Sequence, residues 1–397
     1  MKIKLAVIFG GKSVEHEISI ISALQAIRHL NKEKYEVIPV YISKSNEMYY
    51  GEDLVNIEEY SNLSNLLKKS KKVMFYTQGG KTYLKKAETK LFQKDIITEV
   101  DIAFPIVHGT NCEDGTLHGY LKMMNLPLVG CDLTASAIGM DKYYMKTVFK
   151  DNGIPVLDCK CYTAKDFALS PDDVADSIEK SIPYPVIVKP VNLGSSVGIS
   201  KASDRNELIE SLQNAFNFAG KVLIERAVQN LKEVNCSVLG DCDEARASEC
   251  EEPVGSDNIL SYEDKYTSGS KGGSKTGSKG MASLKRKIPA DITDSQRDTI
   301  RKMAVDAFKC LGCNGIVRID FMIDTISGEI FLNEINTIPG SLSFYLWEPL
   351  GVSYTNLLDS MIDLGLKRHR EQEEISYAFD TNVLEGMSFG GSKGSKM

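Results

Sequence analysis

Residues 315–340 read GIVRIDFMIDTISGEIFLNEINTIPG, and this stretch decides how the last third of the chain folds. Two runs rich in β-branched and aromatic residues, Gly315–Ile323 and Glu329–Ile335, are joined by a short turn that ends near a glycine. Such a pattern is typical of a β-hairpin. The Pro-Gly pair that closes the stretch predicts the end of the second strand.

Polar side chains interrupt this apolar hairpin at regular positions. Because successive side chains of a strand point to opposite faces, Arg318 shares a face with Asp320, and Glu334 shares a face with Asn336. Oxygen ligands suit a hard cation such as magnesium, and a small number of them suits a cation that keeps water and phosphate oxygens. The pattern therefore indicates either a magnesium site with an arginine beside it or a surface hairpin with alternating polar residues.

The composition of the chain is that of a globular protein with more than one domain. It has 397 residues, of which 42% are hydrophobic and 25% are charged, so about two or three domains are expected. The formal net charge of −7 argues against nucleic acid as the main partner, since phosphate binding needs a basic surface. No apolar run approaches the roughly 18 residues of a membrane helix, and no signal peptide is evident. We expect a cytoplasmic protein whose nine cysteines are reduced.

The first third of the chain alternates strand-like and helical segments. The expected elements are strands at Lys2–Phe9, Tyr35–Ile42 and Val100–Val107 and a helix at Ile18–Leu30. This alternation predicts βαβ units and a parallel sheet, which binds ligands at the carboxyl ends of its strands. Loops 10–17 and 108–115 follow two of the strands and should lie at that edge. Glu15 in the first loop is placed either to hold a substrate ammonium or to favour the dipole of the following helix.

Two further blocks of mixed α/β character follow. The expected elements are helices at Asp141–Asp151 and Ser295–Leu311, strands at Pro185–Lys189, Val222–Glu225 and Val234–Gly240, and the hairpin. From these blocks we expect an N-terminal domain at 1–139, a central domain at 140–225, a C-terminal domain at 226–367, and a charged, flexible tail at 368–397.

Two lysines and a loop of small residues are candidates for phosphate binding. Lys189 ends a strand and precedes Gly194, Ser195 and Ser196, whose small side chains let backbone N–H groups approach an anion. Lys142 opens a helix and is the second candidate. Each feature also has an ordinary interpretation, as a hairpin turn or as a lysine on a helix surface.

A stretch of low complexity lies in the third block. Residues 268–280 read SGSKGGSKTGSKG, which is close to the phosphate-binding pattern GxxxxGK[ST]. A loop of that kind must join a strand to a helix, and no buried strand precedes this stretch. We interpret the segment at 266–287 instead as a lengthened, lysine-rich lid.

Several motifs occur in a fixed order along the chain. They are GGKSVEHEIS, HGTNCEDGTLHG, VGCDLTASAIGMDK, PVIVKPVNLGSSVGISK, EDKY, GIVRIDFMID and NEINTIPG. In this order the chain resembles the D-alanine–D-alanine ligases of the ATP-grasp superfamily over roughly residues 1–365. The resemblance implies an α/β (α+β) ATP-grasp fold of three domains, with a Rossmann-like parallel sheet in the N-terminal domain and ATP between the other two.

The same resemblance implies a role for each motif residue. ATP contacts are implied for Lys142, Lys189, Ser196, Glu225, Ala227, Val228, Glu233 and Lys265. Two magnesium or manganese ions are implied at Asp320, Glu334 and Asn336. The implied catalytic residues are Glu15, Ser195, Tyr266 and Arg318, and the implied D-alanine contacts are His108, Gly340, Tyr345 and Leu346. Arg318 and the Gly340 N–H group would stabilise the tetrahedral oxyanion.

The segment after the Pro-Gly turn departs from the family pattern. The family continues with a Ser/Thr-rich run that holds the carboxylate of the second D-alanine, whereas residues 341–349 here read SLSFYLWEP. Tyr345 stands where the carboxylate-binding serine is expected, between Phe344 and Trp347. These aromatic side chains either shape the acceptor pocket or pack in the core.

The implied activity is the ATP-dependent formation of D-alanyl-D-alanine, through D-alanyl phosphate, for peptidoglycan precursor synthesis. Two alternatives stay open. A related ligase would join D-alanine to another acceptor, such as D-serine, another D-amino acid or an amine, and a non-catalytic homologue would only bind nucleotide or amino acid. The expected partners are ATP, D-alanine and a second copy of the chain, without nucleic acid or membrane.

Overall fold

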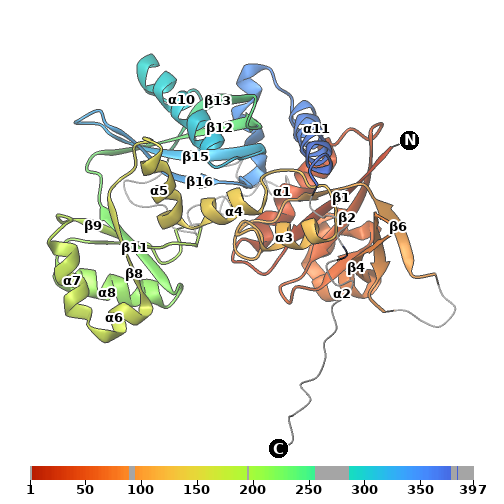
Figure 1. Cartoon of the computed structure of the whole chain (residues 1–397), viewed down its shortest axis with the longest axis horizontal. Helices are drawn as coiled ribbons and strands as arrows, with labels where there is room; N and C mark the ends of the chain where they lie inside the picture. Colours follow the sequence, from red (N-terminus) through yellow and green to blue (C-terminus); the bar gives the residue numbers. More distant parts are fainter. Residues whose placement is uncertain (1, 89–93, 195, 255–285, 377–381, 383–397) are drawn as a thin grey trace, which may run out of the picture.

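Three β-sheets follow one another along the chain in the computed structural model (Figure 1). The structure describes residues 2–88, 94–194, 196–254, 286–376 and 382. We propose that the three sheets mark domains at 1–139, 140–225 and 226–367. The expected lid lies outside the described residues except for its last two positions, and most of the expected tail lies outside them as well.

The N-terminal sheet has the strand order β6-β5-β4-β3-β2-β1-β7. Its strands are β1 (Ile3–Gly10), β2 (Tyr35–Ile42), β3 (Met48–Tyr50), β4 (Lys71–Gln78), β5 (Lys81–Lys86), β6 (Ile96–Val100) and β7 (Ile102–Pro105). β1 pairs in parallel with β2 and β7, and the other pairs are antiparallel. The parallel pairing expected for the strands of the first third is therefore confirmed, and the outer strands add antiparallel pairs that the sequence analysis did not predict. Short turns such as Gly79-Gly80, both at positive φ, join those strands and permit only antiparallel pairing.

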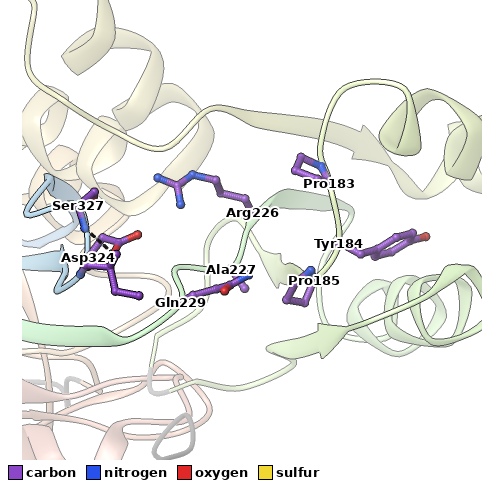
Figure 2. A pocket seen from close by; sticks show the side chains of 9 residues that line it. Pro183, Tyr184, Pro185, Arg226, Ala227, Gln229, Asp324 and Ser327 are labelled. Atoms are coloured by element: carbon purple, nitrogen blue, oxygen red, sulfur yellow. Dashed lines mark hydrogen bonds between the residues drawn. The ribbon is translucent and has the colours of Figure 1, made fainter.

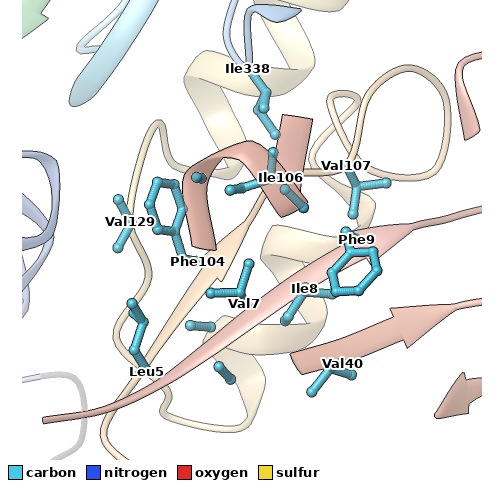
Figure 3. Packing of buried hydrophobic residues seen from close by; sticks show 14 of the residues in the cluster. Leu5, Val7, Ile8, Phe9, Val40, Phe104, Ile106, Val107, Val129 and Ile338 are labelled. Atoms are coloured by element: carbon cyan, nitrogen blue, oxygen red, sulfur yellow. The ribbon is translucent and has the colours of Figure 1, made fainter. Parts of the chain in front are cut away.

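The core of this sheet continues into the C-terminal part of the chain. Figure 3 shows Leu5 and Val7 of β1 near Phe104 and Val129, with Ile338 reaching the same cluster from far along the sequence. The helices around the sheet are α1 (His16–His29), α2 (Leu63–Lys69), α3 (Thr116–Met123) and α11 (Tyr354–Glu373), with short 3-10 helices η1 (Glu52–Val55) and η2 (Ile57–Asn62). Helix α11 lies close to α1 in Figure 1 and packs against it. The first sheet and the C-terminal part thus share one core.

Helix α11 also revises the expected boundary of the tail. The helix continues to Glu373, six residues past position 367. Arg368 donates hydrogen bonds to the backbone oxygens of Gly130 and Leu128, at 2.7 and 2.8 Å. Residues 368–373 are therefore part of the folded protein and not of a flexible tail. None of the helices in the described ranges is long and apolar enough to cross a membrane.

His118 of α3 is a buried histidine whose protonation opposes folding. Its ring is almost completely buried, and Nδ1 lies 3.1 Å from the carbonyl oxygen of Cys112. Burial lowers the pKa of His118 from 6.5 to about 4. Because the pKa of His118 is lower in the folded than in the unfolded protein, protonation favours the unfolded state. The unfolding free energy is therefore unaffected by protonation of His118 above about pH 6.5 and decreases as the pH falls toward 4.

We therefore expect His118→Gln to reduce the acid sensitivity of the protein. An amide N–H can still donate to the Cys112 carbonyl, but it does not titrate. Between pH 7.5 and pH 4.5 the wild type should lose roughly 2 to 3 kcal/mol more unfolding free energy than the variant. Urea unfolding at the two pH values measures this difference, and equal losses in both proteins would contradict it.

The central sheet is antiparallel, with the order β10-β9-β11-β8. Its strands are β8 (Cys159–Thr163), β9 (Val186–Pro190), β10 (Ser200–Ala202) and β11 (Lys221–Arg226), and its helices are α6 (Ala164–Leu169), α7 (Pro171–Glu179) and α8 (Arg205–Phe216). Ser170 caps α7, Pro171 occupies its first turn, and Asp172 and Asp173 favour its dipole.

The helix expected at Asp141–Asp151, at the start of the central domain, packs against the third sheet and not against the central one. Helices α4 (Leu133–Met140) and α5 (Lys142–Asp151) place Ala135, Met145 and Phe149 in the core of the third sheet. The long connection from α5 to the central sheet can be followed in Figure 1. As a consequence, α5 is fixed to the C-terminal sheet while its N-terminus faces the Gly/Ser loop of the central sheet.

The third sheet has the order β14-β13-β12-β15-β16. Its elements are β12 (Leu231–Gly240), β13 (Ala245–Pro253), β14 (Arg286–Lys287), β15 (Gly315–Asp324), β16 (Ile330–Asn336) and helix α10 (Asp294–Cys310), followed by η5 (Gly340–Leu346) and η6 (Glu348–Leu350). The hairpin predicted at 315–335 is confirmed. Val317, Ile319 and Phe321 pack in the core with α10, so the alternate residues of β15 face the other side.

Candidate functional site

A row of polar side chains crosses the third sheet. Glu251 of β13 lies opposite Asn235 of β12, Asn235 lies opposite Asp320 of β15, and Asp320 lies opposite Glu334 of β16. Directly opposite residues of antiparallel strands project from the same face. The two carboxylates predicted from the hairpin are therefore neighbours on the face that α10 leaves uncovered.

Arg318 and Asn336 both bind Asp320 on this face. The guanidinium of Arg318 donates from Nε and Nη2 to the two oxygens of Asp320, each at 2.7 Å, and Asn336 Nδ2 donates to Oδ2 at 3.2 Å. Burial raises the pKa of Asp320, the charge of Arg318 opposes that rise, and the nearby Glu334 adds to it. The structure thus brings together all four hairpin residues on one face of the sheet, and the magnesium interpretation of this group stays a prediction.

Lys142 joins this face to the Gly/Ser loop. As the first residue of α5, after the capping Asp141, it places Nζ 3.3 Å from Glu334 Oε2. The same ammonium donates to the carbonyl oxygen of Leu193 at 2.9 Å. Its positive charge therefore lies between the carboxylates of the hairpin and the loop that the sequence predicted to bind phosphate.

A buried ion triad lies beside it. Glu225 accepts from Lys189 Nζ at 2.6 Å, and Lys146 Nζ lies 2.6 Å from its other oxygen. All three side chains are at most 4% exposed. Burial alone would raise the pKa of Glu225, but the charges of Lys146 and Lys189 outweigh it and lower the pKa to about 2. Lys189 also donates to Asn333 Oδ1 at 3.1 Å.

The two expected ATP ligands Lys189 and Glu225 are thus bonded to each other, and sequence reasoning missed their partner Lys146. The spacing in the sequence could have identified Lys146, because it lies one helical turn after Lys142 and both lysines therefore share one face of α5.

A pocket of about 310 Å³ lies where β11 leaves the central sheet. Figure 2 shows Arg226 and Ala227 beside Pro185, with Asp324 and Ser327 of the β15–β16 turn on the other side. Of the residues expected to contact ATP, Ala227 lines this pocket. Val228 follows it in the chain, and Glu233 lies on β12 opposite Met322 of β15.

The two loops at the carboxyl ends of β1 and β7 meet, as predicted. Ser13 Oγ donates to the carbonyl oxygen of His108 at 2.6 Å and accepts from the Glu15 N–H at 3.1 Å. A Cβ built on Gly109 would lie 3.0 Å from Glu15 Oε2, and one on Gly194 would lie 3.2 Å from the same oxygen. The Glu15 carboxylate therefore lies between the loop that follows β7 and the Gly/Ser loop. The absence of a side chain at Gly109 and Gly194 leaves room for it.

His108 fixes the segment that carries Gly340. Burial lowers the pKa of His108, so its ring is neutral. Nδ1–H donates to the Ile338 carbonyl oxygen at 2.8 Å, and Nε2 accepts from Ser22 Oγ at 2.9 Å. Ser22 Oγ in turn accepts from the Ser341 N–H at 3.0 Å. The expected substrate contact His108 is therefore engaged within the protein, on both sides of Gly340.

Glu113 completes this arrangement and was missed by sequence reasoning. Its carboxylate accepts from the Gly109 N–H at 2.7 Å and from the Ile338 N–H at 3.2 Å. Burial and the charge of Glu15 raise the pKa of Glu113 to about 8. Both backbone groups of Ile338 are thus held from the N-terminal sheet, by Glu113 and His108.

We expect Glu113→Ala to weaken both folding and turnover. The change leaves two buried N–H groups without their acceptor, which should lower the unfolding free energy by roughly 2 to 4 kcal/mol. The shift of Gly340 should lower kcat by about 10-fold or more. Denaturant unfolding and turnover assays measure both effects. Glu99→Ala, which removes a surface ion pair with Lys81, is the control, and an unchanged unfolding midpoint for Glu113→Ala would contradict the account.

The segment after Gly340 is strained. Ser341, Leu342 and Ser343 all have positive φ, at 51°, 51° and 48°. Consecutive left-handed residues other than glycine each cost about 1 to 2 kcal/mol. The hydrogen bond from Ser341 Oγ to Gln25 at 2.8 Å, together with the contact to Ser22, holds the turn from α1. Such strain concentrates at functional segments.

The aromatic side chains of residues 341–349 were expected either to shape the acceptor pocket or to pack in the core, and the structure places them in different surroundings. Trp347 is completely buried and donates from Nε1 to Ser237 Oγ at 3.1 Å, and Phe344 stacks on Tyr354 with ring centres 4.4 Å apart. Trp347 therefore packs in the core and does not line a pocket, whereas the partly buried Phe344 packs against the core and its pocket interpretation stays a prediction. Leu346 is also completely buried, so its side chain cannot contact a substrate. Tyr345 lies against the charged groups of Arg286 and Glu251.

The expected catalytic residues Ser195 and Tyr266 and the expected ATP contact Lys265 lie outside the described residues. Ser196 is described and has a positive φ of 61°. Among the described residues, no group of three or more His, Cys, Asp or Glu side chains could hold a metal ion. The proposed magnesium ligands are two carboxylates and an amide, a smaller set that relies on water and phosphate oxygens.

Comparison with known proteins agrees with this arrangement. A family model described as D-ala D-ala ligase N-terminus matches residues 4–131, and one described as D-ala D-ala ligase C-terminus matches residues 148–363. A D-alanine--D-alanine ligase from Thermosipho melanesiensis is 38% identical over 384 residues, which cover 96% of this chain and 98% of the relative.

Solved structures agree as well. The D-alanine-D-alanine ligase from Coxiella burnetii has a TM-score of 0.76 at 28% identity and covers 94% of this chain and 96% of its own. VanG D-Ala:D-Ser ligase from Enterococcus faecalis has a TM-score of 0.76 at 32% identity and covers 92% of this chain and 100% of its own. These matches confirm the expected multi-domain α/β fold of the ATP-grasp class. The chain belongs to the D-alanine–D-alanine ligase family.

Proposed function

We propose that this protein joins two D-alanine molecules in a reaction that converts ATP to ADP and phosphate. The observation that carries the proposal is the set of Arg318, Asp320, Glu334 and Asn336 on one face of the third sheet, with Lys142 beside it. The product would be D-alanyl-D-alanine for peptidoglycan precursors. A cytoplasmic location and a homodimer remain predictions from the sequence.

The residues on the hairpin fit magnesium. Asp320 and Glu334 are neighbours across β15 and β16, and the pKa of Asp320 is raised by burial and by Glu334, so the site favours an added positive charge. Asn336 adds an amide oxygen, and the ligands are all hard oxygens. Magnesium held by these three residues would neutralise charge on the phosphates of ATP. Manganese has the same ligand preference.

In the first step, a carboxylate oxygen of D-alanine attacks the γ-phosphorus of ATP. The bond to the β-γ bridging oxygen breaks, and D-alanyl phosphate and ADP form. Glu15, at the junction of the two loops, would hold the ammonium group of this D-alanine. Lys142 would neutralise phosphate oxygens from its position between Leu193 and Glu334. Positioning and charge neutralisation account for the rate.

In the second step, the amine of the acceptor attacks the carbonyl carbon of D-alanyl phosphate. A C–N bond forms, the C–O bond to phosphate breaks, and the amine releases a proton. The carbonyl oxygen carries negative charge in the tetrahedral intermediate. Arg318, whose pKa is kept above its ordinary value by Asp320 despite burial, and the N–H of Gly340 would stabilise this oxyanion.

The test is a turnover assay with product identification. ATP, magnesium and D-alanine together should give phosphate and a dipeptide of the mass of D-alanyl-D-alanine, and omission of any one should stop both. ATP turnover that ignores D-alanine, or turnover without dipeptide, would refute the proposal. D-serine as a second amino acid in the same assay tests the mixed-acceptor alternative.

A further inference from the structure

A second charged cluster adjoins the Arg318–Asp320 pair and has no role in the steps above. Glu251 is 3% exposed and accepts from Arg286 Nη1 at 2.8 Å, Asn235 Nδ2 at 3.0 Å and the Tyr345 hydroxyl at 3.3 Å. We call these four residues the Glu251 cluster. The guanidinium carbon of Arg286 lies 3.8 Å from the centre of the Tyr345 ring. A stack of this kind fixes the plane of the guanidinium.

The cluster is part of the row that crosses the sheet. Glu251 and Asp320 lie on either side of Asn235, two strand spacings apart, which is about 10 Å. Asn235, which donates to Glu251, lies directly opposite Asp320, so the cluster adjoins the Arg318–Asp320 pair. The cluster therefore lies on the side of Asp320 that is opposite to Glu334.

Stability does not explain such a cluster. The side chains of Arg286 and Glu251 are 11% and 4% exposed. The electrostatic attraction within a buried ion pair is little larger than the free energy that desolvating its two ions costs. Apolar side chains of similar volume would stabilise the sheet at least as well. Burial and the charge of Glu251 raise the pKa of Tyr345 to about 12, so its phenol keeps its proton and remains a donor. The phenol proton is donated to Glu251, so the group that the cluster presents next to the reacting groups is the oriented guanidinium of Arg286.

We propose that Arg286 binds the carboxylate of the acceptor amino acid, with Tyr345, Glu251 and Asn235 as positioning residues that fix its guanidinium. This assignment rests on the proposed ligase function and names the acceptor class, which is an amino acid with a free carboxylate. A guanidinium presents donors on more than one edge, so it can bind a protein carboxylate and a ligand carboxylate together.

The geometry favours this direction for the acceptor. Its amine must reach the carbon whose oxyanion Arg318 would stabilise, and its carboxylate lies about one residue length, roughly 3.8 Å, further on. Toward Asp320 and Glu334 the carboxylate would meet the ligands of the proposed magnesium site. Toward the Glu251 cluster it would meet the guanidinium of Arg286, which also binds Glu251.

The experiment compares two acceptors, D-alanine and D-alaninamide, with D-alanine as donor and product masses as the readout. D-alaninamide keeps the amine and the methyl group but lacks the carboxylate. Arg286→Gln should lower kcat/KM for D-alanine as acceptor by about 10- to 100-fold, mainly through KM. The same variant should change kcat/KM for D-alaninamide by less than about 3-fold, and Arg286→Lys should recover part of the preference for D-alanine.

Arg246→Gln is the matched control. Arg246 also lies over an aromatic ring of the same segment, at 5.4 Å from Trp347, and it is exposed. This variant should keep the wild-type ratio between the two acceptors. An equal loss with both acceptors in Arg286→Gln, or an unchanged ratio in Arg286→Gln, would overturn the assignment. Absence of any product from the wild type is a different result, which would overturn the ligase function itself.

Discussion

Replacement of Glu334 by glutamine should lower magnesium-dependent ATP turnover by about 10³-fold or more at saturating ATP and D-alanine. The variant keeps the size of the side chain but removes a negative charge from the neighbour of Asp320. It also removes the ion pair of Lys142, which is 3.3 Å long in the structure. A magnesium titration of turnover measures the effect, and raising the magnesium concentration should restore only part of the activity.

Glu329→Gln is the matched control for this experiment. Glu329 precedes β16 in the same hairpin, is exposed, and accepts a hydrogen bond from Ser327 Oγ at 3.1 Å. Its replacement should leave turnover within about 2-fold of the wild type. Turnover of Glu334→Gln within 10-fold of the wild type at the same magnesium concentration would contradict the proposed metal site.

Replacement of Glu225 by glutamine should lower the unfolding free energy by about 3 to 5 kcal/mol. The change leaves Lys146 and Lys189 buried next to each other without the carboxylate that both bind. Burial lowers the pKa of Lys146 even with Glu225 present, and the variant should lower it further. The deficit should therefore shrink as the pH rises, because a neutral lysine no longer needs the partner.

Urea unfolding of Glu225→Gln at pH 7 and pH 9.5 measures this effect. Glu17→Gln is the control, since Glu17 forms an exposed pair with Lys44 at 2.7 Å and its loss should change stability by about 0.5 kcal/mol or less. If Glu225→Gln lowered the unfolding free energy by less than about 1 kcal/mol, the ion pairs of Glu225 with the two buried lysines would not stabilise the fold as the structure indicates. In the wild type, the lowered pKa of Glu225 adds stability above about pH 4.5 that is lost toward pH 2.

The hairpin at 315–336 shows what the sequence can predict. The alternation of side chains correctly predicted which face of the strands carries Arg318, Asp320, Glu334 and Asn336, and the short turn predicted that the two strands pair. Both predictions succeeded because they depend only on residues that are close in the chain. The outer strands of the first sheet were missed. β4 reads KKVMFYTQ, which alternates only weakly because the exposed Met74 and Tyr76 are about as apolar as the buried Val73 and Phe75.

Contacts between distant segments could not be predicted in this way. Arg286 and Glu251 are 35 positions apart, and Glu113 and Ile338 are 225 apart, so no local pattern joins either pair. The burial of Trp347 was equally hidden, because an aromatic residue suits a pocket wall and a core alike. The family resemblance supplied roles for single residues but not for Glu113, Lys146 or Arg286.

The formation of an acyl phosphate is the central claim of this account, and isotope transfer tests it most directly. D-alanine labelled with ¹⁸O in its carboxylate is incubated with the protein, magnesium and ATP, and the phosphate released is analysed by mass spectrometry. The account predicts one ¹⁸O atom in each phosphate, because the oxygen that attacks ATP leaves with phosphate when the amine attacks. Unlabelled phosphate, released together with dipeptide or without it, would contradict the account.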